Sequence, residues 1–127
     1  KDVYTMDIAA YWKSALAQQP GKMRSFFRPD ALVYWHNTNE CFNLEEFIQA
    51  NCDYPGEWQG DIERTETMSD LIITVVHVYS ADRTVSCHAT SFFTIKEDKI
   101  ARIDEYWGDD GPAPQWRLDK QIGRPIR

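Results

Sequence analysis

The sequence lacks the short motifs that mark metal, nucleotide and nucleophile sites. It has no HxH, HExxH or paired-cysteine spacing, no glycine-rich phosphate loop, and no serine or cysteine in a strand-turn-helix elbow. Its three histidines, His36, His77 and His88, are well separated in the chain. We therefore expect no metal and no cofactor, and a metal site assembled from these histidines and nearby acids is the less favoured alternative.

Cysteine is scarce and basic residues are in the minority. Cys41, Cys52 and Cys87 are odd in number and lie among small or apolar residues, which is typical of free thiols and favours a reducing cytoplasm. The 14 basic and 20 acidic residues give a net charge of −6, which repels phosphate backbones and anionic membrane surfaces. No apolar run is long enough to cross a bilayer, and no basic-then-apolar leader follows Lys1. We expect neither nucleic acid nor a membrane as partner.

Aromatic residues, in contrast, are abundant: five Trp, six Tyr and six Phe in 127 residues, with an apolar fraction of 43%. This composition indicates a folded globule, and the length suits one domain over residues 1–127. Residues 112–127 contain three prolines and resemble an extended C-terminal arm. Its Trp116, Leu118 and Ile122 suggest that the arm docks on its own body or on a second subunit.

The order of the expected elements is helices first and strands afterwards. Apolar spacing predicts helices over residues 4–16 and 22–28, and Asn43 with Glu46 predicts the capped start of a third helix that ends near residue 51. Strand patterns cover residues 31–37, 58–68, 71–79, 84–95 and 100–107, joined by short turns that imply antiparallel neighbours. This is the α+β pattern, with helices on one face of a twisted sheet. The strand over 71–79 is apolar on both sides, so we expect a second copy to cover the face without helices.

Glu105 is the most unusual residue of the last strand. Alternation places Ala101, Ile103, Glu105 and Trp107 on one side, which is the more apolar one and should face the core. A carboxylate held against an indole has its charged form disfavoured, which raises its pKa and suits it to act as a general acid or base. The alternative is a solvated Glu105 that pairs with Arg102 or a neighbouring lysine.

The other strands add candidates for a pocket around Glu105. Small residues, Ala89 and Ser91, in the middle of the strand over 84–95 leave space above them. His77 is a candidate proton partner on the same face as Glu105, although a histidine in an apolar strand is often a satisfied core residue. We expect Trp35 to face inward together with Asn37, whose amide would fix the polar edge of a ligand. The candidate ligand-binding residues are Trp12, Trp35, Asn37, Trp58, Ser91, Phe93 and Trp107.

Three segments together resemble the nuclear transport factor 2-like superfamily, which includes SnoaL-like polyketide cyclases and ketosteroid isomerases. They are the first helix with Tyr11 and Trp12, the run Phe27-Arg28-Pro29-Asp30-Ala31, and the final hairpin over residues 92–107. The segments HNTNE, YPGEW and IDEYWGDDG look like a narrower bacterial branch. The resemblance implies a cone, or cystatin-like roll: a curved antiparallel sheet wrapped on its concave side by three helices, with a pocket between them and commonly a dimer through the sheet.

The resemblance also bears on chemistry. Tyr11 falls where ketosteroid isomerases carry a helix-borne oxyanion tyrosine, and Trp107 matches a tryptophan that some of them carry in the pocket. Those enzymes use an aspartate base and a neutral aspartic acid. Here the base position holds Trp35 and the acid position Ser91, so steroid isomerisation by that mechanism is not supported.

Two function classes follow. The first is a lyase, isomerase or cyclase in which Glu105 is the acid or base, Tyr11 and Ser91 donate hydrogen bonds to developing oxygen charge, and His77 assists. The second is a non-catalytic module in which the same aromatic residues hold a small apolar or aromatic molecule, or a homodimer assembles. A pure interaction protein, based on the doubly apolar strand and the arm, is a third reading.

Overall fold

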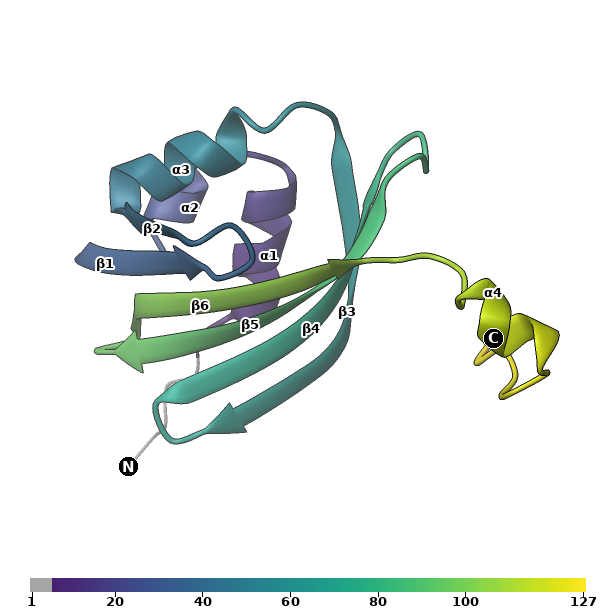
Figure 1. Cartoon of the computed structure of the whole chain (residues 1–127). Coiled ribbons are helices and arrows are strands. Elements are labelled where there is room, and N and C mark those ends of the chain that lie inside the picture. Colours follow the sequence, from purple (N-terminus) through teal and green to yellow (C-terminus); the bar gives the residue numbers. More distant parts are fainter. Residues whose placement is uncertain (1–5) are drawn as a thin grey trace.

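The computed structural model describes residues 6–127, which form four helices and one six-stranded sheet (Figure 1). The helices are α1 (Ile8–Leu16), α2 (Pro20–Arg24), α3 (Leu44–Cys52) and α4 (Gln115–Asp119). The strands are β1 (Phe27–Trp35), β2 (Glu40–Asn43), β3 (Trp58–Met68), β4 (Leu71–Ser80), β5 (Ser86–Lys96) and β6 (Lys99–Asp109). The architecture is α+β, as the sequence predicts.

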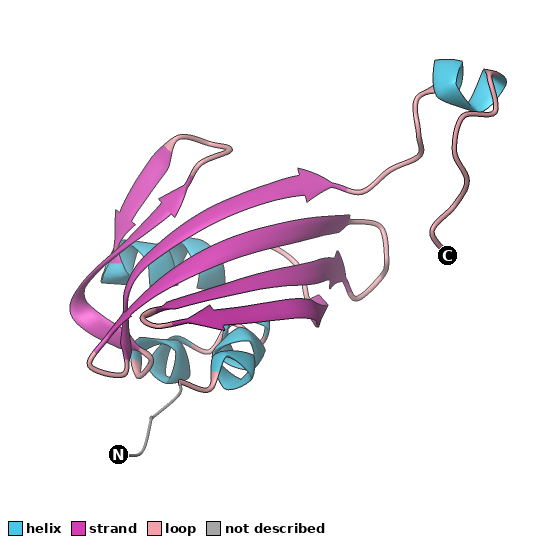
Figure 2. Cartoon of the chain, turned by 90° about the horizontal axis from the view of Figure 1, so that it is seen from below, coloured by secondary structure: helices cyan, strands magenta, loops and turns pink. Residues whose placement is uncertain are grey.

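The strands lie in the order β2-β1-β6-β5-β4-β3, and the sheet is curved (Figure 2). Four of its five pairings are antiparallel, whereas β1 and β6 pair in parallel. The short turns between β3, β4, β5 and β6 correctly predict the antiparallel meander. The parallel pair arises because β1, from the start of the chain, packs beside the last strand, with α3 and four strands in the long connection between them.

The first two helices differ in their boundaries from the sequence prediction. Asp7 caps α1 by accepting a hydrogen bond from the Ala10 amide, and the predicted start at Tyr4 lies outside the described residues. Pro20 does not merely follow the first helix but begins α2, because a proline at the first helical position loses no intrahelical hydrogen bond. Helix α2 ends at Arg24, and β1 begins at Phe27, four residues earlier than predicted.

Helix α3 has the predicted start. Asn43 accepts a hydrogen bond from the Glu46 amide, and the Glu46 carboxylate accepts one from the Asn43 amide, at 2.9 Å each. This reciprocal capping box fixes the helix directly after β2, a short strand that the sequence pattern did not reveal.

Helices α1, α2 and α3 cover the concave face of the sheet, and the core lies between these two layers (Figures 1 and 2). Val33, Val76, Phe93, Ile100 and Ile103 are fully buried on the sheet side. On the helix side Tyr11 packs edge-on against Phe93, with 5.4 Å between ring centroids. The helices thus leave the convex face of the sheet uncovered.

After β6 the chain leaves the body. Residues 112–127, the C-terminal arm, are all exposed and point away from the sheet in both views (Figures 1 and 2). The arm contains α4, which the sequence pattern did not predict. Within residues 6–127, no helix combines the length and apolar character needed to span a bilayer.

Candidate functional site

A row of side chains crosses four neighbouring strands on the concave face. Trp35 of β1 is in register with Glu105 of β6, Glu105 with Ser91 of β5, and Ser91 with Thr74 of β4. Paired residues of neighbouring strands point to the same face, so their side chains meet. Trp12 of α1 closes the row by donating its indole N–H to Thr74 Oγ1 at 3.0 Å.

Glu105 occupies the centre of this row and is only 8% exposed. The indole of Trp35 donates to Oε1 at 2.9 Å, and the hydroxyl of Ser91 donates to Oε2 at 2.5 Å. The inward placement agrees with the alternation of β6. Among the described residues the carboxylate pairs with neither Arg102 nor a lysine, and the Arg102 guanidinium binds Asp104 instead.

Burial shifts the pKa of Glu105. Loss of solvation raises the pKa of its carboxyl group, and the hydrogen bonds from Ser91 and Trp35 offset part of this rise. An indole N–H can only donate, so Oε1 must remain an acceptor. The proton of the neutral acid therefore belongs on Oε2, where the Ser91 hydroxyl is able to accept as well as to donate.

A cavity of about 200 Å³ lies against this row, between the sheet and the ends of α1 and α3. Its size is below the usual range of roughly 300–1,000 Å³ for drug-sized ligands, so it suits a smaller molecule. Apolar and aromatic side chains dominate its walls. The lining residues are Trp12, Ala15, Leu16, Gln18, Trp35, Asn51, Tyr54, Trp58, Val78, Val85, Cys87, Ala89, Glu105, Trp107 and Asp109.

Aromatic contacts hold the walls in place. Trp35 packs edge-on against Trp107, with ring centroids 5.5 Å apart, and Tyr54 packs in the same way against Trp58 at 5.6 Å. The Trp58 indole donates to the Pro55 carbonyl at 3.1 Å. These contacts restrain the indole rings before any ligand arrives.

The amide of Gln18 ties α1 to the end of α3 at the mouth of the cavity. Its Nε2 group donates to the carbonyls of Asn51 and Tyr54 at 3.0 and 2.8 Å. Asn51 in turn donates to the Ala15 carbonyl at 2.9 Å. The two helix ends therefore form one rigid side of the opening.

Tyr11 and Phe93 lie beneath the cavity and do not line it. Tyr11 is 1% exposed, and burial together with the negative charge of Glu105 holds the pKa of its phenol well above the usual value. Tyr11 therefore remains a hydrogen-bond donor near Glu105. Phe93 is fully buried against Tyr11 and Trp12.

His77 does not share a face with Glu105, so its predicted orientation is wrong. The pairing of β4 with β5 places Thr74 and Val76 on the concave face and His77 on the convex face. Its Nε2 atom contacts the Ser86 hydroxyl at 2.8 Å, and its ring stacks on His88 with 5.0 Å between centroids.

Asn37 also departs from its predicted role. Strand β1 ends at Trp35, so alternation no longer governs the side-chain direction of Asn37. Its amide nitrogen donates to the Trp107 carbonyl, and its amide oxygen accepts from the Trp107 N–H at 2.9 Å. Asn37 thus fastens the end of β6 and does not contact the cavity.

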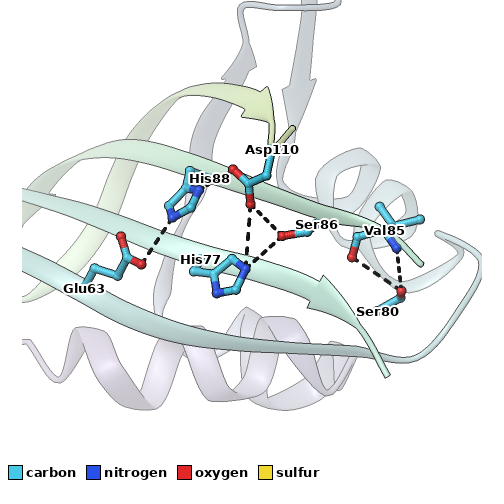
Figure 3. Close-up of polar contacts among 7 residues, drawn as sticks. All are labelled: Glu63, His77, Ser80, Val85, Ser86, His88 and Asp110. Carbon is cyan, nitrogen blue, oxygen red and sulfur yellow. Dashed lines mark hydrogen bonds and ion pairs between the residues drawn. The ribbon is translucent and has the colours of Figure 1, made fainter. Parts of the chain in front are cut away.

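A second polar cluster lies on the convex face and comprises Glu63, His77, Ser86, His88 and Asp110 (Figure 3). His88 contacts Asp110 at 2.5 Å and Glu63 at 3.2 Å, and the hydrogen bond to Asp110 is the main cause of the raised pKa of its imidazole. Among residues 6–127, no group of three or more His, Cys, Asp or Glu side chains is arranged to hold a metal ion. The cluster instead fastens Asp110, which directly follows β6, to β5.

Sequence reasoning missed several lining residues. Val78 belongs to the even side of β4, which is as apolar as the odd side, so the pattern does not show which side faces inward. Thr74, which belongs to the polar row and does not line the cavity, carried no signal except its position in that strand. The space expected above Ala89 is part of the cavity, and Cys87 could have been found with it, because both share the side of β5 that contains Ser91.

No protein-family model and no curated protein matches this chain. Solved structures do. A candidate ketosteroid isomerase from Kribbella flavida has 15% identity and a TM-score of 0.79, with 94% of this chain and 87% of that chain covered. A candidate SnoaL-like polyketide cyclase from Jannaschia has 12% identity and a TM-score of 0.71, with coverages of 98% and 99%.

A third solved structure includes a bound small molecule. It is a protein with a ketosteroid isomerase-like fold from Catenulispora acidiphila in complex with trimethylamine, with 12% identity, a TM-score of 0.64, and coverage of 81% of this chain and 86% of that chain. At these identities the similarity establishes the fold alone. The chain therefore has the nuclear transport factor 2-like fold that its sequence resembles.

Proposed function

We propose that the concave cavity binds a small, mostly apolar molecule and that Glu105 exchanges a proton with it as general acid or base. One observation carries the proposal: a buried carboxyl group with a raised pKa lines an apolar cavity. Such a group is poised for proton transfer nearer to neutral pH than an exposed glutamate.

The two oxygens of Glu105 support this role in different ways. Trp35 fixes Oε1 and so orients the carboxyl plane, while Oε2 shares its hydrogen bond with the Ser91 hydroxyl, which is able to reverse its direction. Proton abstraction next to a carbonyl group is the reaction class that fits best. Isomerisation and cyclisation, named for two of the similar folds, are compatible with it.

Tyr11 is a secondary candidate as hydrogen-bond donor. Its phenol stays protonated, but the ring is covered by Trp12 and Phe93. A direct contact with substrate would require one of these rings to move. Glu105 lines the cavity and needs no such movement, whereas Ser91 is fully buried and acts through its hydrogen bond to Glu105. His77, on the other face, takes no part.

The substitution Glu105→Gln tests the proposal. The glutamine amide preserves both contacts, because its oxygen accepts from Trp35 and its nitrogen donates to Ser91. We expect deuterium exchange from D₂O into a panel of small cyclic ketones, followed by NMR, to slow by about 10²–10⁴-fold. Thermal-shift binding of the same ketones should remain, and exchange equal to that of the wild type would refute the proposal.

A non-catalytic binding module is the second candidate. It is favoured by the fact that both oxygens of Glu105 already have hydrogen-bond partners within the protein. In that case neither wild type nor Glu105→Gln would exchange any ketone, although both would bind. The same experiment therefore separates the two functions.

We further propose that two copies associate through the convex face of the sheet. Ile73, Val75 and Phe92 share this face with Tyr106, which is 46% exposed. Apolar side chains on a face without helices favour burial against a second copy.

A further inference from the structure

The C-terminal arm exposes large apolar side chains, and nothing within residues 6–127 buries them. Trp116, Leu118 and Ile122 are 56%, 50% and 56% exposed. Both views show α4 well separated from the sheet and from the other helices (Figures 1 and 2). Three such side chains on one short segment are typical of a binding element rather than of a solvated tail.

The segment that joins the arm to β6 directs it outward. It reads Gly111-Pro112-Ala113-Pro114, and a residue that precedes proline is disfavoured in the helical region. Pro114 itself is extended, with φ −57° and ψ 146°. This stiff, extended connection opposes folding of the arm onto its own body.

Charge identifies the surface that the arm complements. Residues 112–127 contain four basic side chains and one acidic side chain, a net charge of +3. The preceding 111 residues contain 10 basic and 19 acidic side chains, a net charge of −9. The arm is therefore attracted to a body of the same kind as its own, which a second copy supplies.

The cavity mouth is the part of that body that matches the arm in chemistry. Tyr54 and Val85 line it while 54% and 45% exposed, so its rim is apolar and open. Acidic side chains accompany them: Asp109 also lines the cavity, and Asp53 precedes Tyr54 directly in the chain. The apolar rim matches the side chains of Trp116 and Leu118. The acidic border matches Arg117, which lies between them in the sequence.

Symmetry makes the contact reciprocal. The arm begins within three residues of Asp109, so its base and the mouth lie at the same edge of the body. Two copies related by a two-fold axis near this edge are each able to place an arm on the mouth of the other, and such an exchange closes without further copies.

We propose that two copies exchange their C-terminal arms, so that Trp116 and Leu118 of one copy cover the cavity mouth of the other. The binding site of each copy is then completed by its partner. The inference rests on the proposed function only in regarding the cavity as a ligand site, because the exchange itself is measured without any ligand.

Cross-linking between two different chains tests the exchange. The first chain carries Leu118→Cys as its only cysteine, with serine at positions 41, 52 and 87. The second carries a size tag and keeps only Cys87, which lines the cavity. The two are mixed and treated with a short bismaleimide. The matched control replaces the second chain by one that keeps only Cys41, which is exposed on β2, away from the mouth.

We expect the mixed dimer band with Cys87 to be at least tenfold stronger than that with Cys41. Bands of equal strength, or no band while both cysteines react with a simple maleimide, would overturn the exchange. So would cross-linking within a single chain that carries Leu118→Cys and Cys87 together, because the arm would then cover its own cavity. Ketone binding and exchange are measured separately, so failure of the proposed function would be seen independently.

Discussion

Glu105 is held by two donors of different kinds, and this difference controls its titration. Trp35 can only donate, whereas Ser91 is able to donate or accept. Removing either donor destabilises the carboxylate more than the neutral carboxylic acid. The pKa of Glu105 is thus adjustable through single neighbouring atoms.

Ser91→Ala should raise the pKa of Glu105 further. A hydrogen bond to a charged group is worth about 1.5–3 kcal/mol, which corresponds to about one to two pH units. The titration midpoint is measured by ¹³C NMR of the Glu105 carboxyl carbon. Ser86→Ala is the matched control, since Ser86 lies on the same strand but binds Asp110. A midpoint that is unchanged or lower in Ser91→Ala would contradict the assigned hydrogen bond.

The raised pKa of Glu105 also predicts how stability depends on pH. In the folded state the group holds its proton to higher pH than in the unfolded state, so its contribution is present below the ordinary pKa of 4.5 and is lost as pH rises through the raised value. Glu105→Gln removes this loss. Its stability relative to the wild type should therefore increase with pH across that window, by about 1.4 kcal/mol per unit of pKa shift.

Urea unfolding at several pH values measures this difference. Glu57→Gln, at an exposed position, is the control and should show no such trend. A constant difference between Glu105→Gln and wild type would mean that burial does not perturb the titration of Glu105.

At the scale of elements, Gly60 of β3 lies tightly between β4 and the end of α1. A Cβ atom at this position would lie 3.0 Å from the His77 carbonyl oxygen and 3.0 Å from Leu16 Cδ1. Because Leu16 lines the cavity, added bulk here would also shift its wall.

Gly60→Ala should destabilise the fold by about 1–3 kcal/mol, the usual cost of overpacking. Gly108→Ala is the matched control, because a Cβ atom at Gly108 meets nothing within 4 Å. Urea unfolding of both variants measures the effect. Equal stabilities of Gly60→Ala and Gly108→Ala would contradict this, because the end of α1 would then shift without cost.

The elements also show what the sequence could and could not predict. Glu105 lies between Ile103 and Trp107 on the more apolar side of β6, so alternation alone placed it inward. Strand β4 is apolar on both sides, so alternation carried no such information, and only its register with β5 assigns His77 to the convex face. Asn37 follows the end of β1, where the period of two no longer applies. The hydrogen-bond partners of Glu105 come from β1 and β5, and their assembly depends on a parallel pairing that no local pattern shows.

At the scale of the whole molecule, the proposed association through the convex face is tested by a substitution at Val75. Val75 lies on this face in β4, between β3 and β5. Val75→Asp should convert a dimer into a monomer, because a charge in an apolar contact loses its solvation. Light scattering measures the mass, and both forms are tested without residues 112–127 so that the arm makes no contribution. A parent protein that is already monomeric, or a variant that remains dimeric, would contradict the contact.

Asn37 and Trp107 form two hydrogen bonds in opposite directions, so the side-chain amide takes the place of a further residue of β1. Only an amide offers a donor and an acceptor in this geometry. Spontaneous deamidation would replace the donor by a carboxylate oxygen facing the Trp107 carbonyl. Deamidation at this one position would therefore loosen the last residues of β6, and with them the Trp107 indole that forms a wall of the cavity.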